Sequence, residues 1–282
     1  MLKLLKQARA AISLLSADEV RKRAEKPVHI GLVADGSGAY AEMEAFLVPN
    51  ELPREELRQR MMQLHRANDE APPASVDVVL YEPGLACPQG AFTYHRGAPE
   101  RTVAEILEEK PDLALALARQ FPVFRTAVVE EIIHEVAREN ALFAVATALP
   151  NVVPNLIELP WLFGEFASDT AFLTANQVRM AFQIAAACGK NVGLAQQKFE
   201  VLGIAGGAFG WRALARELVG HIPLGGGLIP KGAIAYAGTY LTGKGLELLH
   251  TQNARHTSEE LKTLYARGLE RGREVARTLR RA

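Results

Sequence analysis

The sequence predicts an α+β fold that is mostly α, in which a small α/β region precedes an all-helical domain. Two short runs of strand-forming apolar residues, Val28–Ala34 and Val76–Tyr81, lie in the first part of the chain between helix and turn signals. From Val128 onward, apolar residues recur at helical spacing. The change of pattern, near Pro122 to Thr126, indicates the boundary between the two parts.

The composition is that of a folded protein with balanced charge. Of 282 residues, 49% are hydrophobic and 23% are charged, with 32 basic and 32 acidic side chains. This composition supports a buried core and argues against a disordered chain. The zero net charge argues against a nucleic-acid partner. Cys87 and Cys188 are far apart and form no CxxC pair, so neither a zinc site nor a disulfide framework is implied, and a cytoplasmic setting is expected.

We divide the chain into four segments: an N-terminal amphipathic helix (1–26), the α/β region (27–121), the helical domain (125–250) and a charged C-terminal helix (251–282). In the first segment basic residues interrupt the apolar ones, which is not the pattern of a secretory signal. A basic amphipathic helix binds an anionic membrane surface or packs on its own protein, and both interpretations stay open.

Each element of the α/β region has its own signal. The strand Val28–Ala34 runs into the turn Asp35-Gly36-Ser37-Gly38, and Pro72-Pro73 breaks the chain before the strand Val76–Tyr81. The other elements expected here are helices that end at Phe46 and span Pro53–Arg66, Thr102–Glu109 and Pro111–Gln120, and an irregular loop over 87–99.

In the helical domain, Thr174 followed three residues later by Gln177 has the form of a capping box, and Gly189 is expected to end that helix. We expect Glu139 and Asn140 to form buried polar contacts that fix helix register, with Arg179 or Arg212 as the partner.

Two apolar stretches of the helical domain are candidates for membrane-spanning helices. A spanning helix needs ~20 continuous apolar residues. Ala141–Ile157 contains two prolines, and Leu218–Gly243 is interrupted by His221 and Lys231, so neither is a convincing span. Small residues at intervals of four (Ala235, Thr239 and Gly243) favour close helix packing, in a bilayer or in a soluble bundle.

The turn at 35–38 follows a strand and precedes a helix, the order that binds phosphate on backbone N–H groups at a helix N-terminus. In a Walker A loop, a lysine and a hydroxyl complete the site. Aligned on the strand, Tyr40 and Ala41 occupy those positions, and Asp35 adds negative charge where phosphate would lie. We interpret 27–121 as a degenerate P-loop-like region without GTP hydrolysis. Its cofactor-binding candidates are Asp35, Gly36, Ser37 and Gly38; the simpler interpretation is that the two glycines adopt positive φ in a tight turn.

The segments LTANQVRMAFQIAAA, GWRALARELVGHIP and AIAYAGTYLTGKG, in this order, resemble the helical region of undefined function found after GTPase domains in bacterial proteins and in YcjF-type inner-membrane proteins. The resemblance covers about 128–249. It implies association with the inner membrane and a relationship to GTPases. The strand VDVVLYEPG looks like the GTPase strand that ends in D-x-x-G, but Tyr81 replaces its aspartate, and the guanine-reading NKxD element does not occur.

We therefore expect a non-catalytic, membrane-associated interaction or scaffold protein, cytoplasmic and attached to the inner membrane. Its partner would be another protein or a second copy of the chain, and no catalytic residue, metal ligand or cofactor is predicted. The seven histidines show no HExxH or other metal spacing, and His29 and His134 are expected to have packing or surface roles. The alternative is a GTPase-like nucleotide-binding protein that uses the turn from Asp35 to Gly38.

Overall fold

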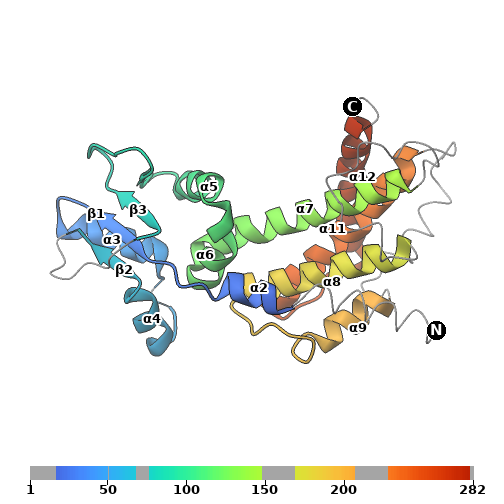
Figure 1. The fold of residues 1–282 in the computed structure, drawn as a ribbon, viewed down its shortest axis with the longest axis horizontal. Coiled ribbons are helices and arrows are strands. Elements are labelled where there is room, and N and C mark those ends of the chain that lie inside the picture. Colours follow the sequence, from blue (N-terminus) through green and yellow to red (C-terminus); the bar gives the residue numbers. More distant parts are fainter. Residues whose placement is uncertain (1–16, 50, 68–75, 148–168, 207–227, 280–282) are drawn as a thin grey trace. The chain divides into compact units, whose positions relative to one another are not determined.

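The computed structural model describes residues 17–49, 51–67, 76–147, 169–206 and 228–279, with the backbone alone at 169–171 and 228–230. These residues belong to two compact units. The sheet unit comprises Arg21–Val129 and Ala186–Lys190, and the helical unit comprises the described parts of Met1–Val20, Glu130–Ala185 and Asn191–Ala282. Figure 1 shows short strands and many helices, so the predicted α+β, mostly α class is confirmed.

Several predictions fall outside the described residues. They concern the amphipathic pattern of 1–16, the proline-rich stretch at 148–168, and the segment 207–227 with Arg212 and His221. The four predicted segment boundaries stay predictions.

The sheet unit contains short strands and short helices. They are β1 (Ile30–Val33), α3 (Ser37–Leu47), α4 (Arg54–Met61), β2 (Leu64–Arg66), β3 (Val78–Tyr81), β4 (Phe92–Thr93), α5 (Pro99–Glu109), the 3-10 turn η1 (Pro111–Leu113), α6 (Ala114–Gln120) and the 3-10 turn η2 (Pro122–Phe124). Helix α2 (Ala17–Ala24) precedes them.

The four strands form a parallel sheet in the order β2-β1-β3-β4. In the central strand, Ile30 pairs with Leu64 of β2 on one side and with Val78 of β3 on the other. Ile30, Leu32, Val78 and Leu80 of these strands are buried, whereas Val79 and Tyr81 on the other face of β3 are partly exposed. Because parallel strands end at the same edge, Asp35 after β1 and Glu82 after β3 lie close together there.

The predictions for two segments of this unit were wrong. The sequence predicted one helix from Pro53 to Arg66, but the helix ends at Met61 and Leu64–Arg66 forms β2. The loop expected over 87–99 contains β4, which pairs with β3 through Leu80 and Phe92. Strands of two or three residues are too short to show an alternating pattern, and their pairing with a neighbouring strand decides their conformation.

The C-terminal end of the helix α8 (Asp169–Ala187) belongs to the sheet unit. Arg119 donates a hydrogen bond to the carbonyl of Lys190 at 2.6 Å, and Arg125 donates one to the carbonyl of Ala187 at 3.0 Å. Arg125 thus satisfies a terminal carbonyl that the helix leaves unpaired, at the end where its dipole is negative, and Arg119 binds a carbonyl just beyond that end.

The helical unit contains long helices. They are α7 (Arg125–Ala146), which begins in the sheet unit, most of α8, α9 (Lys198–Gly206), α11 (Leu228–Gln252) and α12 (Ser258–Leu279). Figure 1 shows α11 and α12 packed along each other. Among the described residues, the helices lack the continuous apolar length that a membrane crossing requires.

The helix ends follow the sequence in part. The capping box predicted at Thr174 was wrong, because α8 already begins at Asp169 and the Gln177 side chain is buried. Gly189 ends the helix as predicted, at a φ of 75°. Asn253, at a φ of 51°, follows the end of α11 in the same left-handed conformation, which asparagine tolerates better than most residues.

Glycines set the distance between the helices of this unit. A Cβ atom on Gly272 of α12 would lie 2.8 Å from the Cα of Ala233, and one on Gly268 would lie 3.1 Å from the Cα of Ala237, both on α11. A Cβ on Gly243 of α11 would lie 2.6 Å from a side-chain carbon of Ile133 on α7. Of the three small residues from which close helix packing was predicted, these contacts confirm it at Gly243.

Helix α12 is less solvated than its charge suggested. The sequence predicted a charged C-terminal helix, and two of its residues, Tyr265 and Ala276, are buried at 1% and 3% exposure. Tyr265 packs in a cluster with Ala237 and Leu241 of α11. The charged residues occupy the opposite side of an amphipathic helix, so a high charge content did not exclude a packed face.

We predict that Gly272→Ala destabilises the protein. Overpacking a close contact typically costs ~1–3 kcal/mol, which exceeds the ~1 kcal/mol that alanine contributes over glycine in a free helix. Chemical denaturation followed by circular dichroism should show a net loss of about 1–2 kcal/mol. The matched control is Gly206→Ala in α9, where a Cβ meets nothing within 4 Å and stability should stay the same or rise. Equal stability of the two variants would contradict the close approach of α11 and α12.

Candidate functional site

The predicted phosphate turn lies at the carboxyl edge of the sheet, where β1 and β3 end side by side. In open α/β sheets, ligands bind at this edge where the strand order reverses. Here the backbone N–H of Asp35 donates a hydrogen bond to the Glu82 carboxylate at 3.0 Å. Ser37 and Gly38 form the first turn of α3. The Glu82 carboxylate therefore occupies a backbone N–H of the turn at the start of a helix, where a phosphate site would need free donors and positive charge.

The interpretation of Gly36 and Gly38 as positive-φ residues was wrong. Gly36 is the N-cap of α3 with a φ of −136°, which is extended backbone, and Gly38 is helical. A Cβ on either residue would meet nothing within 4 Å. Neither conformation nor space requires glycine in this turn.

An arginine that follows β4 at this edge is already paired. Arg96, just after β4, contacts Glu42 of α3 at 2.7 Å. The hydrogen bond and charge of Glu42 raise the pKa of Arg96 above its usual range, and Glu82 adds to this effect. This geometry favours the interpretation of the turn as a packing element over that of a phosphate site.

The helical unit contains a buried cluster of neutral polar side chains. Asn140 of α7 donates a hydrogen bond to the hydroxyl of Thr239 of α11 at 2.8 Å and accepts one from Asn176 of α8 at 3.0 Å. Gln177 also donates to the Thr239 hydroxyl, at 3.3 Å, and that hydroxyl donates to the carbonyl of Ala235 at 2.9 Å. Three helices thus share one network in the interior, which fixes their register.

An ion pair lies next to this cluster. Arg179 of α8 contacts the carboxylate of Glu139, and Asn176 donates to the same carboxylate at 3.3 Å. Burial raises the pKa of Glu139 above its usual value even though Arg179 favours the charged form. The prediction that Glu139 and Asn140 form register-fixing polar contacts with Arg179 as a partner is confirmed.

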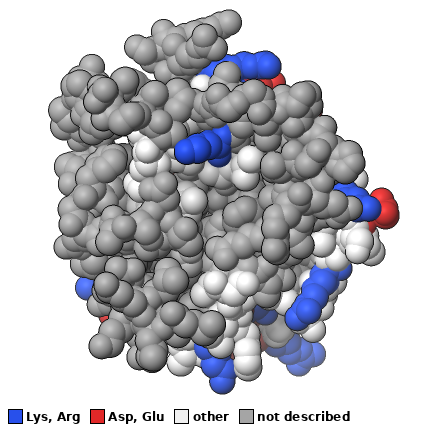
Figure 2. Space-filling model, turned by 90° about the vertical axis from the view of Figure 1, so that its right-hand side faces the viewer, with Lys and Arg blue, Asp and Glu red and all other residues white. Residues whose placement is uncertain are grey.

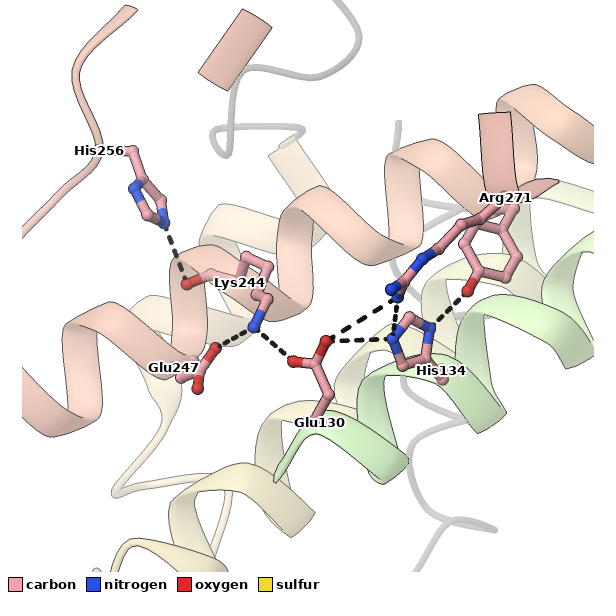
Figure 3. A network of polar contacts seen from close by, with 7 residues as sticks. Glu130, His134, Lys244, Glu247, His256 and Arg271 are labelled. Carbon is pink, nitrogen blue, oxygen red and sulfur yellow. Dashed lines mark hydrogen bonds and ion pairs between the residues drawn. The ribbon is translucent and has the colours of Figure 1, made fainter. Parts of the chain in front are cut away.

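A second, charged network joins α7, α11 and α12. Figure 3 shows Glu130 between His134, Lys244 and Arg271. One carboxylate oxygen of Glu130 lies 3.1 Å from His134 and 4.0 Å from Arg271, and the other contacts Lys244. Lys244 also contacts Glu247 at 2.8 Å. The ring nitrogen of His134 that lies near Glu130 is Nε2, and it also contacts Arg271. The other ring nitrogen, Nδ1, contacts the hydroxyl of Tyr236.

The charges of this network shift the pKa values of its members. The hydrogen bond to His134, helped by Lys244, lowers the pKa of Glu130 to about 2 against the opposing effect of burial. Burial raises the pKa of Tyr236 to about 12. Burial alone would lower the pKa of Lys244, but its bonds to Glu130 and Glu247 raise it above the usual value. Charged Glu130 and Lys244 therefore stabilise each other in the folded state.

No sequence pattern predicted this second network. Tyr236, Lys244 and Arg271 lie more than 100 residues from His134 or Glu130, and only the fold brings them together. The spacing of Glu130 and His134 by four residues was the one available signal, and it is common on helix surfaces. His29 contacts His65 through their ring nitrogens at 2.9 Å, a packing contact within the sheet unit.

The helical unit also exposes large apolar side chains. Phe199 and Leu202 of α9 are 74% and 62% exposed, and Leu194 just before this helix is 50% exposed. Phe199 and Leu202 are three residues apart, so they lie on one side of the helix. The ammonium group of Lys198 lies 4.9 Å from the centre of the Phe199 ring. We call Leu194, Phe199 and Leu202 the α9 apolar surface.

The described acidic, histidine and cysteine residues do not gather into a group of three that would hold a metal ion. On the face drawn in Figure 2, the described lysines and arginines lie at separate places, and some of them lie beside acidic residues. No family model, curated protein or solved structure matches the chain. The resemblance to the helical region of GTPase-associated proteins therefore stays a prediction.

We predict that Thr239→Val destabilises the protein by about 1–3 kcal/mol, because Asn140 and Gln177 lose a buried hydrogen-bond partner. The matched control is Thr242→Val. Thr242 is equally buried on α11, and its hydroxyl also donates to the carbonyl four residues earlier, at 2.9 Å. Unfolding in urea should show a smaller loss for the control. Equal losses would mean that the contacts between helices add nothing.

A second prediction concerns acid. Because the pKa of Glu130 lies below its value in an unfolded chain, its contribution to stability is complete above about pH 4.5 and disappears as the pH falls toward 2. Glu130→Gln should lower the free energy of unfolding at pH 7 by about 1–2 kcal/mol, a figure reduced for solvent screening because the side chain is 36% exposed. The variant should also lose less stability than the wild type between pH 4.5 and 2.

The control for this measurement is Glu259→Gln. Glu259 is 86% exposed and lies 3.7 Å from Lys262, so its removal should change little at either pH. A wild-type acid profile in Glu130→Gln would contradict the role of Glu130.

Proposed function

We propose that this protein is a non-catalytic interaction protein that associates with the cytoplasmic surface of the inner membrane. The observation that carries the proposal is the α9 apolar surface. A helix with exposed Phe and Leu side chains beside a lysine has the features of a segment that lies in the membrane interface, where the apolar groups enter the lipid and the cation stays at the headgroups.

The use of charge in the helical unit supports a structural and interacting role. Glu130, Glu139 and Lys244 contact oppositely charged groups on other helices, and these contacts hold the unit together. At the sheet edge, Glu82 accepts the N–H of Asp35, which gives little support to the alternative of a nucleotide site from Asp35 to Gly38. A protein partner, or a second copy of the chain, would meet the same α9 apolar surface.

The test is flotation with vesicles of phosphatidylcholine and phosphatidylglycerol. The wild type should float with the vesicles, and the double variant Phe199→Ser, Leu202→Ser should bind at least tenfold less, because burying each apolar side chain contributes ~1.5–3 kcal/mol when complete. The control is Met62→Ser, which removes a side chain of 64% exposure from the sheet unit and should float like the wild type.

Analytical ultracentrifugation of the same variants separates lipid binding from self-association. Wild-type protein that stays unbound to vesicles would contradict the proposal. If, in addition, the double variant converted a dimer to a monomer, the α9 apolar surface would be assigned to contact between copies.

A further inference from the structure

His134 lies where three helices meet, and both of its ring nitrogens have partners. Nδ1 contacts the Tyr236 hydroxyl of α11. Nε2 lies 3.1 Å from a Glu130 oxygen on its own helix, and it also contacts the guanidinium of Arg271 on α12. Figure 3 shows these contacts converging on the ring.

Nε2 cannot serve both of its partners at once. A guanidinium is always a donor, so Nε2 must accept when it bonds to Arg271. A carboxylate is an acceptor, so Nε2 must carry a proton when it bonds to Glu130. The protonation of one nitrogen therefore decides whether His134 bonds to α12 or to its own helix α7.

The neutral ring fits the contact with Arg271. Its single proton is then on Nδ1 and is donated to the Tyr236 oxygen, while the Nε2 lone pair accepts from Arg271. When the ring takes up a second proton, Nε2–H donates to Glu130. Arg271 then faces a donor group and a like charge, and it competes with the imidazolium for the same Glu130 oxygen, which lies 4.0 Å away.

We propose that the protonation state of His134 controls the attachment of α12: the neutral ring binds Arg271, and the protonated ring releases it. The charged and titratable groups around His134 come from every helix of the network. Glu130 is on α7, Arg271 is on α12, and three residues are on α11: Tyr236, Tyr240, whose ring stacks on His134 at 5.5 Å, and Lys244, which holds the second oxygen of Glu130. Glu247, bound to Lys244, completes the set.

Release of Arg271 acts on a helix that covers apolar surface. Tyr265 of α12 packs on Ala237 and Leu241 of α11, with Leu261, Leu264 and Leu269 around them. Looser attachment of α12 would expose these side chains when the pH falls. Histidine is the side chain suited to such a response, because imidazoles change charge between about pH 5 and 8. This inference does not rest on the proposed membrane function.

The first test is amide hydrogen exchange of the full chain at pH 8 and at pH 5.5, corrected for the intrinsic pH dependence of exchange. Loss of one hydrogen bond between side chains should reduce the protection of α12 about tenfold relative to α8 at the lower pH. His134→Gln and Arg271→Gln should each remove this pH dependence. The control His256→Gln, which removes the histidine that contacts the Lys244 carbonyl, should keep it.

Nitrogen NMR of the His134 ring is a second test that needs no variant. At pH 8 the proton should be on Nδ1 and Nε2 should be bare. A proton on Nε2 at pH 8 would overturn the proposal. Unchanged protection of α12 in the wild type would also overturn it, as would a pH response that persists in both His134→Gln and Arg271→Gln.

Discussion

The close approach of α11 to its neighbours is the constraint on which the helical unit depends. Gly268 and Gly272 of α12 let that helix lie against the backbone of α11, and Gly243 leaves room for Ile133 of α7. At these distances short polar side chains reach across the interface, which is how Thr239 meets Asn140. Wider spacing would leave those groups buried without partners, at a cost of about 1–3 kcal/mol for each.

The two polar networks of this unit stabilise it in different ways. The cluster around Asn140 and Thr239 is neutral and buried. Its contribution to stability therefore depends on complete hydrogen bonding and changes little with pH. The network around Glu130 is charged and partly exposed, so it depends on mutual neutralisation and on the protonation of its members. The neutral network fixes the register of the helices, and the charged network makes the attachment of α12 sensitive to pH.

The sequence predicted the features that depend on neighbours along the chain and missed those that depend on distant pairing. The long helices, the strands β1 and β3 and the end of α8 at Gly189 have local signals that the fold preserves. The short strands β2 and β4 exist only because they pair with strands that were recognised. In the site, Glu139 with Arg179 was predicted because both lie on strongly patterned helices. The contact of Arg271 with His134 joins residues 137 positions apart and leaves no local trace.

The hydrogen bonds at the C-terminal end of α8 affect the order in which the protein folds during synthesis. Arg119 and Arg125 bind carbonyls that lie 62 to 71 residues later in the chain. A ribosome adds about 5–20 residues each second, so these arginines wait several seconds for their partners. The sheet unit can collapse in that interval, but the hydrogen bonds from Arg119 and Arg125 form only after α7 and most of α8 have emerged. A nascent chain arrested before Ala186 would therefore lack the carbonyl partners of both guanidinium groups, and Arg119 would have only its ion pair with Glu25, at 3.9 Å.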